Sequence, residues 1–180
     1  SVTAAHADVS ISGSGSFEIN DDDSSQTYSS DGSVSITGSN TTDSGLTLTA
    51  VSQLKFEGGA VNDSYINIAG DFGSIRMGNT DDALDLNDGA VPSNWDENGH
   101  AGGFAIGGKQ GAGNETISFT APTISGIKAY GFSSSNGSES GMGVNYSNGP
   151  VTVMYQTGED GTNSETLIAA NFSMAGATIG

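Results

Sequence analysis

The residues of this chain that could perform chemistry are few, and they form no catalytic pattern. The chain has two histidines and no cysteine, so a disulfide framework and a cysteine-ligated metal site are both excluded. Neither His6 nor His100 belongs to a Ser-His-Asp arrangement or to a histidine pair with metal-ligand spacing. We therefore expect no enzymatic activity.

One segment resembles the start of a phosphate-binding loop. Residues 103–109 read GFAIGGK, but Gln110 stands where a Ser or Thr would coordinate magnesium. No helical pattern follows the lysine. We set this motif aside.

Acidic loops offer oxygen ligands for calcium at residues 20–23 and 160–165. Neither loop has the ligand spacing of an EF-hand, so solvated surface charge is the simpler interpretation. Weak calcium binding in these loops stays open as an alternative, and we expect no other cofactor.

The charge balance of the chain is strongly acidic. It carries 21 Asp and Glu against 4 Lys and Arg, a formal net charge of −17. Binding to nucleic acid needs a basic face for the phosphates, so that class of function is excluded. An acidic molecule instead attracts cations.

The elements that position these residues are predicted to be strands. Apolar and polar side chains alternate with period two in most segments between residues 8 and 180, which is typical of strands with two different faces. Short turn signals recur at one end of the strand pairs, and longer acidic loops at the other. We expect about 11 antiparallel strands, interrupted by one long segment, residues 80–115. No apolar run is long enough for a transmembrane helix.

Two stretches resemble a known family. Residues 41–46 (TTDSGL) and 69–78 (AGDFGSIRMG) are similar to junctions of Gram-negative general diffusion porins, most closely the alphaproteobacterial type. The resemblance implies a sixteen-stranded transmembrane β-barrel in the bacterial outer membrane, with short periplasmic turns. It also implies a homotrimer in contact with membrane lipid. On this interpretation residues 8–180 are a partial barrel covering the N-terminal part, and residues 1–7 are a signal-peptide remnant or a frayed terminus.

The resemblance also implies where the function lies. Porins fold their third external loop into the barrel, and by chain order residues 80–115 correspond to that constriction loop. Lys55 and Arg76 alternate with the apolar side chains of their strands, so we expect both to face the lumen as a small positive wall. The acids expected opposite this wall are Asp81, Asp82, Asp85, Asp88, Asp96 and Glu97. Simple charge pairing with neighbouring acids remains the alternative for both cations.

Several aromatic residues suggest a membrane-interface girdle. Lys128 lies beside a short turn, with Tyr130 and Phe132 on its face, and Tyr146 and Tyr155 fit the same pattern.

The resemblance and the charge balance together predict a water-filled channel for passive diffusion of small hydrophilic solutes, with a preference for cations. The alternative is a secreted or surface-exposed all-β adhesin or carbohydrate-binding module.

Overall fold

The computed structural model describes residues 8–21, 25–56, 61–80, 83–84, 115–135, 137–159, 161–174 and 177–179. In these residues 11 strands form one antiparallel sheet, and each strand pairs with its neighbours in chain order. The strands are β1 (Asp8–Asp21), β2 (Gln26–Thr41), β3 (Thr47–Lys55), β4 (Val61–Gly70), β5 (Gly73–Asn79), β6 (Thr116–Thr120), β7 (Ile127–Ser134), β8 (Ser140–Asn148), β9 (Val151–Glu159), β10 (Ser164–Met174) and β11 (Ala177–Ile179). The predicted all-β, antiparallel fold is therefore confirmed.

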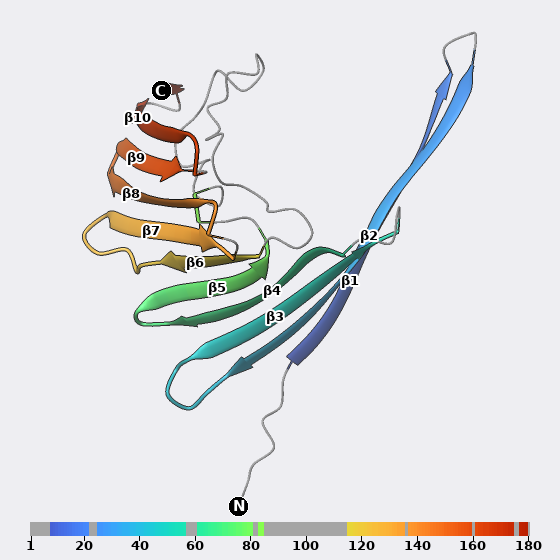
Figure 1. Cartoon of the computed structure of the whole chain (residues 1–180), viewed down its shortest axis with the longest axis horizontal. Helices are drawn as coiled ribbons and strands as arrows, with labels where there is room; N and C mark the ends of the chain where they lie inside the picture. The colour runs from blue at the N-terminus through green and yellow to red at the C-terminus, as the bar shows by residue number, and fades with distance from the viewer. Residues whose placement is uncertain are drawn as a thin grey trace, which may run out of the picture.

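The sheet is curved rather than flat. Figure 1 shows it bending from β1 and β2 at one side to β10 at the other, so that it has a concave and a convex face. A chain of neighbouring antiparallel strands with this curvature forms the wall of a barrel. No helix in the described part of the chain has the length and apolar character needed to cross a membrane.

Tight turns join the strands at one end of the sheet, as the sequence predicts. In the β2–β3 turn, the Gly45 N–H donates to the Thr42 carbonyl oxygen at 2.9 Å. Two residues, Asp71 and Phe72, separate β4 from β5. The next residue, Gly73, has a φ of 107°, and a Cβ there would collide with the Thr120 carbonyl oxygen of β6. Glycine is required at this turn because no other residue fits both the backbone angle and the space.

Alternation along the strands separates the two faces most clearly in β6–β10. On β6, Thr116 and Ser118 are buried, whereas Ile117 and Phe119 between them are exposed. On β9, Met154 and Gln156 are buried on the concave face, and their apolar neighbours point outward. Large apolar side chains on the convex face include Ile127, Met142, Val144, Val153, Tyr155, Ile168 and Phe172. This arrangement, with apolar side chains outside and polar side chains inside, is that of a sheet whose outer solvent is lipid.

The hairpin of β1 and β2 extends beyond the rest of the wall. Its strands have 14 and 16 residues, against 9 in β3. Pairing of β2 with β3 begins at Ser33, and the Phe56 N–H bonds to the Gly32 carbonyl. Residues 16–21 and 26–31 consequently pair only with one another among the described strands. They form a two-stranded ribbon that projects from the sheet (Figure 1).

Candidate functional site

The concave face carries a part of the chain that returns into it after β5. Ala83 and Leu84 have no exposed surface, and they cluster with Tyr130 and Phe132 of β7. A Cβ built at Gly141 of β8 would lie 2.6 Å from Leu84 Cδ1 and 2.9 Å from Phe132 Cε1. The chain after β5 therefore crosses to the concave side of β7 and β8. Ala83 and Leu84 belong to the start of residues 80–115, the expected constriction loop.

Arg76 lies on the same concave face, in the middle of β5. It is paired with Asn67 of β4 and Ser118 of β6, and Ser118 is in turn paired with Phe132. Phe132 is paired with Gly141, so one row across the wall joins Arg76 to the position covered by Leu84. Three strand steps span ~15 Å. Arg76 and Leu84 thus lie over the same row of paired residues, on the same face of the wall.

The Arg76 guanidinium is held by an aromatic ring. Its Cζ lies 4.5 Å from the centroid of the Tyr65 ring, which is within cation–π distance. Tyr65 is opposite Gly78 in the β4–β5 ladder, diagonally next to Arg76. Gly78 has a φ of 136°, and a Cβ there would collide with the Ser64 carbonyl oxygen, so glycine is needed for the close approach of β4 and β5 beside this contact.

Lys55 also belongs to the inward set of its strand, but it lies far from Arg76. It is exposed at the end of β3 and opposite Ser33. From Arg76 the register passes through Asn67 to Thr49 of β3, and Lys55 lies further along that strand. The separation is ~20 Å along the strand and ~10 Å across it. The two cations therefore do not form one continuous positive wall.

The surroundings of Lys55 are polar. A depression of about 420 Å³ beside it is lined mainly by hydroxyl, amide and carboxylate groups. The polar lining residues are Ser14, Ser16, Asp31, Ser33, Gln53 and Lys55. Such a surface suits water and hydrated ions rather than an apolar ligand.

The acids expected opposite Arg76 all lie outside the described residues. These are Asp81, Asp82, Asp85, Asp88, Asp96 and Glu97. Their position relative to Arg76 therefore stays a prediction. Among the described residues, no group of three or more His, Asp or Glu side chains could hold a metal ion.

The predicted girdle is wrong for two of its aromatic residues. Tyr130 and Phe132 are buried on the concave face, at 3% and 6% exposure, whereas Tyr146 and Tyr155 are on the convex face as expected. The outward positions of β7 are taken by small residues, Ala129 and Gly131. Alternation shows which residues share a face of the strand. It does not show which face points outward when both sides of the sheet contain aromatic residues.

Inside the wall, Tyr130 forms a polar cluster that sequence reasoning did not find. Its hydroxyl donates to Asn145 Oδ1 at 2.8 Å and lies 3.1 Å from Gln156 Oε1. Its ring covers Gly143, where a Cβ would lie 2.5 Å from Tyr130 Cε2. The signal in the sequence is Asn145 and Gln156 at inward positions of adjacent strands, with a glycine opposite the tyrosine.

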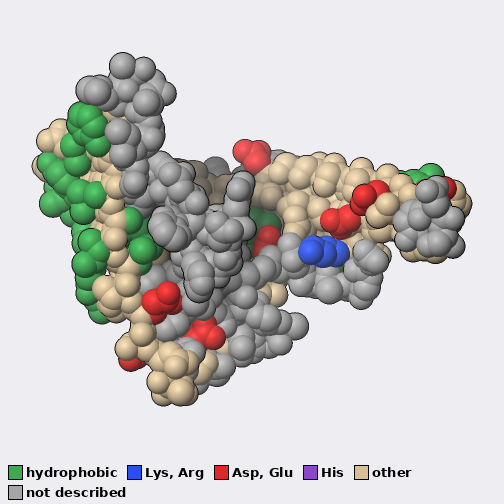
Figure 2. Space-filling model, turned by 90° about the horizontal axis from the view of Figure 1, so that it is seen from above, with side chains coloured by type: hydrophobic (Ala, Val, Ile, Leu, Met, Phe, Trp, Pro, Cys, Tyr) green, Lys and Arg blue, Asp and Glu red, His purple; other side chains and the backbone are tan. Residues whose placement is uncertain are grey.

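The convex face differs from this interior. Figure 2 shows hydrophobic side chains gathered over the outer side of the curved sheet, in the region of β6–β10. An apolar depression of about 490 Å³ forms there around Gly131, with Phe119, Met142, Val144 and Tyr155 in its lining. The depression forms because the outward residues of β7 are small, whereas their neighbours on β6, β8 and β9 are large.

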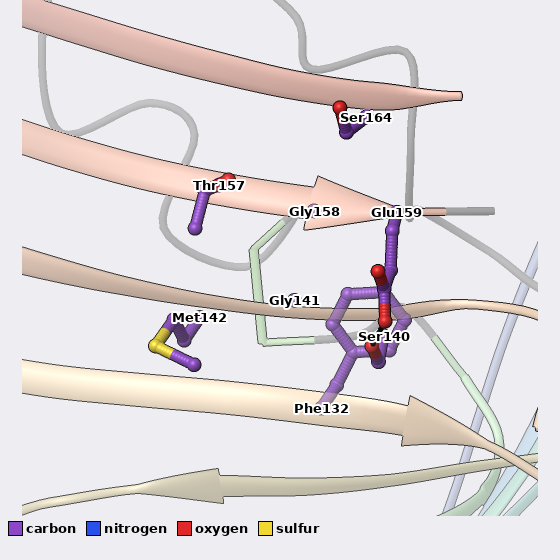
Figure 3. A pocket seen from close by; sticks show the side chains of 8 residues that line it. All are labelled: Phe132, Ser140, Gly141, Met142, Thr157, Gly158, Glu159 and Ser164. Carbon is purple, nitrogen blue, oxygen red and sulfur yellow. Dashed lines mark hydrogen bonds between the residues drawn. The ribbon is translucent and has the colours of Figure 1, made fainter. Parts of the chain in front are cut away.

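A second depression, of about 330 Å³, lies at the loop end of β7–β10 (Figure 3). Its floor includes the paired Gly141 and Gly158, which have no side chains to fill the space. Ser140 donates a hydrogen bond to Glu159 at its rim, with Oγ and Oε1 3.0 Å apart. The Glu159 carboxylate accepts this bond.

The geometry can be compared with known proteins. A sequence profile of the family described as Gram-negative porin matches residues 2–180. A structure solved in a study of the asymmetric conductivity of engineered proteins is similar, with a TM-score of 0.68 and 20% identity, over 95% of this chain and 72% of that one. No curated protein sequence matches this chain.

Mutants of the porin of Rhodopseudomonas blastica are also similar. One has a TM-score of 0.67 and 21% identity, over 94% of this chain and 71% of its own. A second has a TM-score of 0.64 and 19% identity, over 91% of this chain and 69% of its own. These likenesses show a shared fold, and the strand order and curvature described above agree with it.

Proposed function

Because the chain belongs to the family of Gram-negative porins, and so to the bacterial outer membrane, we propose that its diffusion channel for small hydrophilic solutes prefers cations. Porins are channels rather than enzymes, and we propose that this chain likewise catalyses no reaction and needs no cofactor. The observation that carries the channel function is the set of exposed large apolar side chains on the convex face of β6–β10, whereas Thr116, Ser118, Asn145 and Gln156 point to the concave face. The adhesin alternative is not favoured.

The polar interior suits passage of water-soluble molecules. Ser35, Gln53 and Asn67 are partly exposed on the concave face, so a solute moving past them exchanges hydrogen bonds with water for similar bonds with the wall. An apolar interior would offer no such exchange. Passive diffusion needs only this surface and a continuous aqueous path.

Cation preference follows from the charge balance. With 21 acidic residues against 4 basic ones, the potential around the channel is negative and raises the local concentration of cations. Arg76 opposes this effect only locally. We propose that the narrowest point lies between Arg76 and the segment of residues 80–115, whose acids would complete a transverse field.

Assembly and the membrane environment complete the proposal. Ile168 and Phe172 on the convex face would contact lipid hydrocarbon, and porins typically assemble as homotrimers, which we propose here as well. Weak calcium binding to the acidic loops remains a subsidiary proposal. Dialysis against labelled calcium would test it, and the absence of saturable binding at millimolar concentration would overturn it.

The channel is tested by inserting the native full-length protein into a planar lipid bilayer. Stepwise conductance increases are expected, and their absence would overturn the channel function. With a potassium chloride gradient across the bilayer, the sign of the reversal potential gives the preferred ion. A reversal potential with the sign of chloride permeation would contradict cation preference and leave the channel itself supported.

A further inference from the structure

We propose that Tyr65 is a positioning residue, which holds the Arg76 guanidinium against the channel wall and thereby fixes the contribution of Arg76 to ion selectivity. The inference rests on the proposed function, because it concerns the same lumen. It starts from the contact of 4.5 Å between Arg76 Cζ and the Tyr65 ring centroid.

The contact is built into the register of two strands. Tyr65 and Arg76 lie on neighbouring β4 and β5, on the same face, and are offset diagonally by the pairings of Tyr65 with Gly78 and of Asn67 with Arg76. Diagonal neighbours in an antiparallel pair are within reach of long side chains. Gly78 itself contributes no side chain to this face, and its backbone packs closely against Ser64 and Tyr65.

The chemistry of the contact differs from that of an ion pair. In the described part of the chain, no carboxylate forms a salt bridge with Arg76. An aromatic ring attracts the cation through its quadrupole and carries no net charge. The ring therefore restricts where the guanidinium lies without neutralising its charge. A permeating ion consequently meets a positive charge whose place on the wall is set by a neutral ring.

The position of this charge matters because of the row of the sheet in which it lies. Arg76 belongs to the row that runs through Ser118 and Phe132 to Gly141, where Leu84 enters the concave face. A guanidinium released from the ring could swing out over the remaining aqueous path. Since a half-exposed cation–π contact is weak, its loss should lower the ratio of held to released guanidinium about two- to fivefold.

The test is a mutant cycle on the native full-length protein in planar bilayers. The readouts are the cation-to-anion permeability ratio and the open-channel current noise. We expect Tyr65→Leu to raise the noise and shift the ratio, Tyr65→Phe to behave like the wild type, and Arg76→Gln to shift the ratio towards cations. In the Arg76→Gln background, Tyr65→Leu should have no further effect, because Tyr65 acts only through Arg76. Tyr155→Leu, on the convex face, is the matched control and should change neither readout.

The outcomes separate this inference from the proposed function. If the wild type does not conduct, the channel function is overturned. If Arg76→Gln shifts the ratio and Tyr65→Leu leaves both readouts unchanged, the positioning role is overturned. Equal effects of Tyr65→Leu with and without Arg76 would also overturn it. Should Tyr65→Leu fail to fold, Tyr65→Trp replaces it: a stronger cation–π partner should reduce the noise, and unchanged noise would contradict the proposal.

Discussion

Leu84, which follows β5, lies against Gly141 of β8, and no side chain at position 141 separates them. A Cβ at Gly141 would lie 2.6 Å from Leu84 Cδ1 and 3.0 Å from the Thr157 carbonyl oxygen. The glycine therefore provides the place where the returning segment rests on the wall.

Gly141→Val should displace Leu84 and loosen this segment. Overpacking of this kind typically costs ~1–3 kcal/mol, and the single-channel conductance should change because Leu84 lies on the concave face. Gly38→Val is the matched control, since a Cβ at Gly38 meets nothing within 4 Å. An unchanged conductance and unfolding free energy for Gly141→Val would contradict the contact.

Tyr130→Phe should destabilise the barrel without changing its lipid-facing surface. The substitution removes the hydroxyl that donates to Asn145 Oδ1 at 2.8 Å and leaves a buried acceptor unpaired, at a cost of ~1–3 kcal/mol. Tyr155→Phe, whose hydroxyl lies on the convex face, should change the free energy of unfolding by less than ~0.5 kcal/mol. Urea unfolding in phospholipid vesicles measures both values, and equal effects would refute the distinction.

A positive charge on the convex face should oppose folding into a bilayer. Ile168 is 72% exposed on that face, and Ile168→Arg should cost ~2–4 kcal/mol if the residue lies near the bilayer midplane. The neighbouring Leu167 belongs to the concave face, opposite Gln156. Leu167→Arg should therefore be tolerated better during folding into vesicles, and a reversed order would show that the two faces are assigned wrongly.

Lys55 and Arg76 should contribute unequally to ion selectivity. Arg76 lies in the row that reaches the returning segment, whereas Lys55 lies beside a wide polar depression at the end of β3. Charges in a narrow passage with little water are screened less than charges in open solution. Arg76→Gln should therefore shift the reversal potential more than Lys55→Gln, and the difference should persist at high salt. A larger effect of Lys55→Gln would place the narrowest point elsewhere.

Much of the fold could be predicted from the sequence because strand alternation is local. Val153 and Tyr155 alternate with Met154 and Gln156, and this pattern determines both the element and its two faces. The turn at Asp71 and Phe72 could likewise be predicted, since the following glycine supplies the required backbone angle. These features depend on neighbouring residues only.

The arrangement across strands could not be predicted in the same way. The separation of Lys55 from Arg76 depends on the register of three strands, which alternation does not specify. The inward direction of Tyr130 depends on Gly143 of the next strand, which leaves room for its ring. The contact of Leu84 with Gly141 joins a part of the sequence that has no periodic pattern to a strand much later in the chain. Each needs pairing information beyond one strand.

The ribbon of residues 16–21 and 26–31 has a further consequence. Its two strands form ladder bonds only with one another among the described residues, and an isolated two-stranded hairpin is marginally stable in water. On its convex side, Phe17 stacks on Tyr28, with ring centroids 6.1 Å apart. Its backbone amides should therefore exchange hydrogen with solvent much sooner than those of β7–β9. Proteases added to intact cells should find their first cleavage site here, and inserted peptides should be displayed here while the wall stays folded.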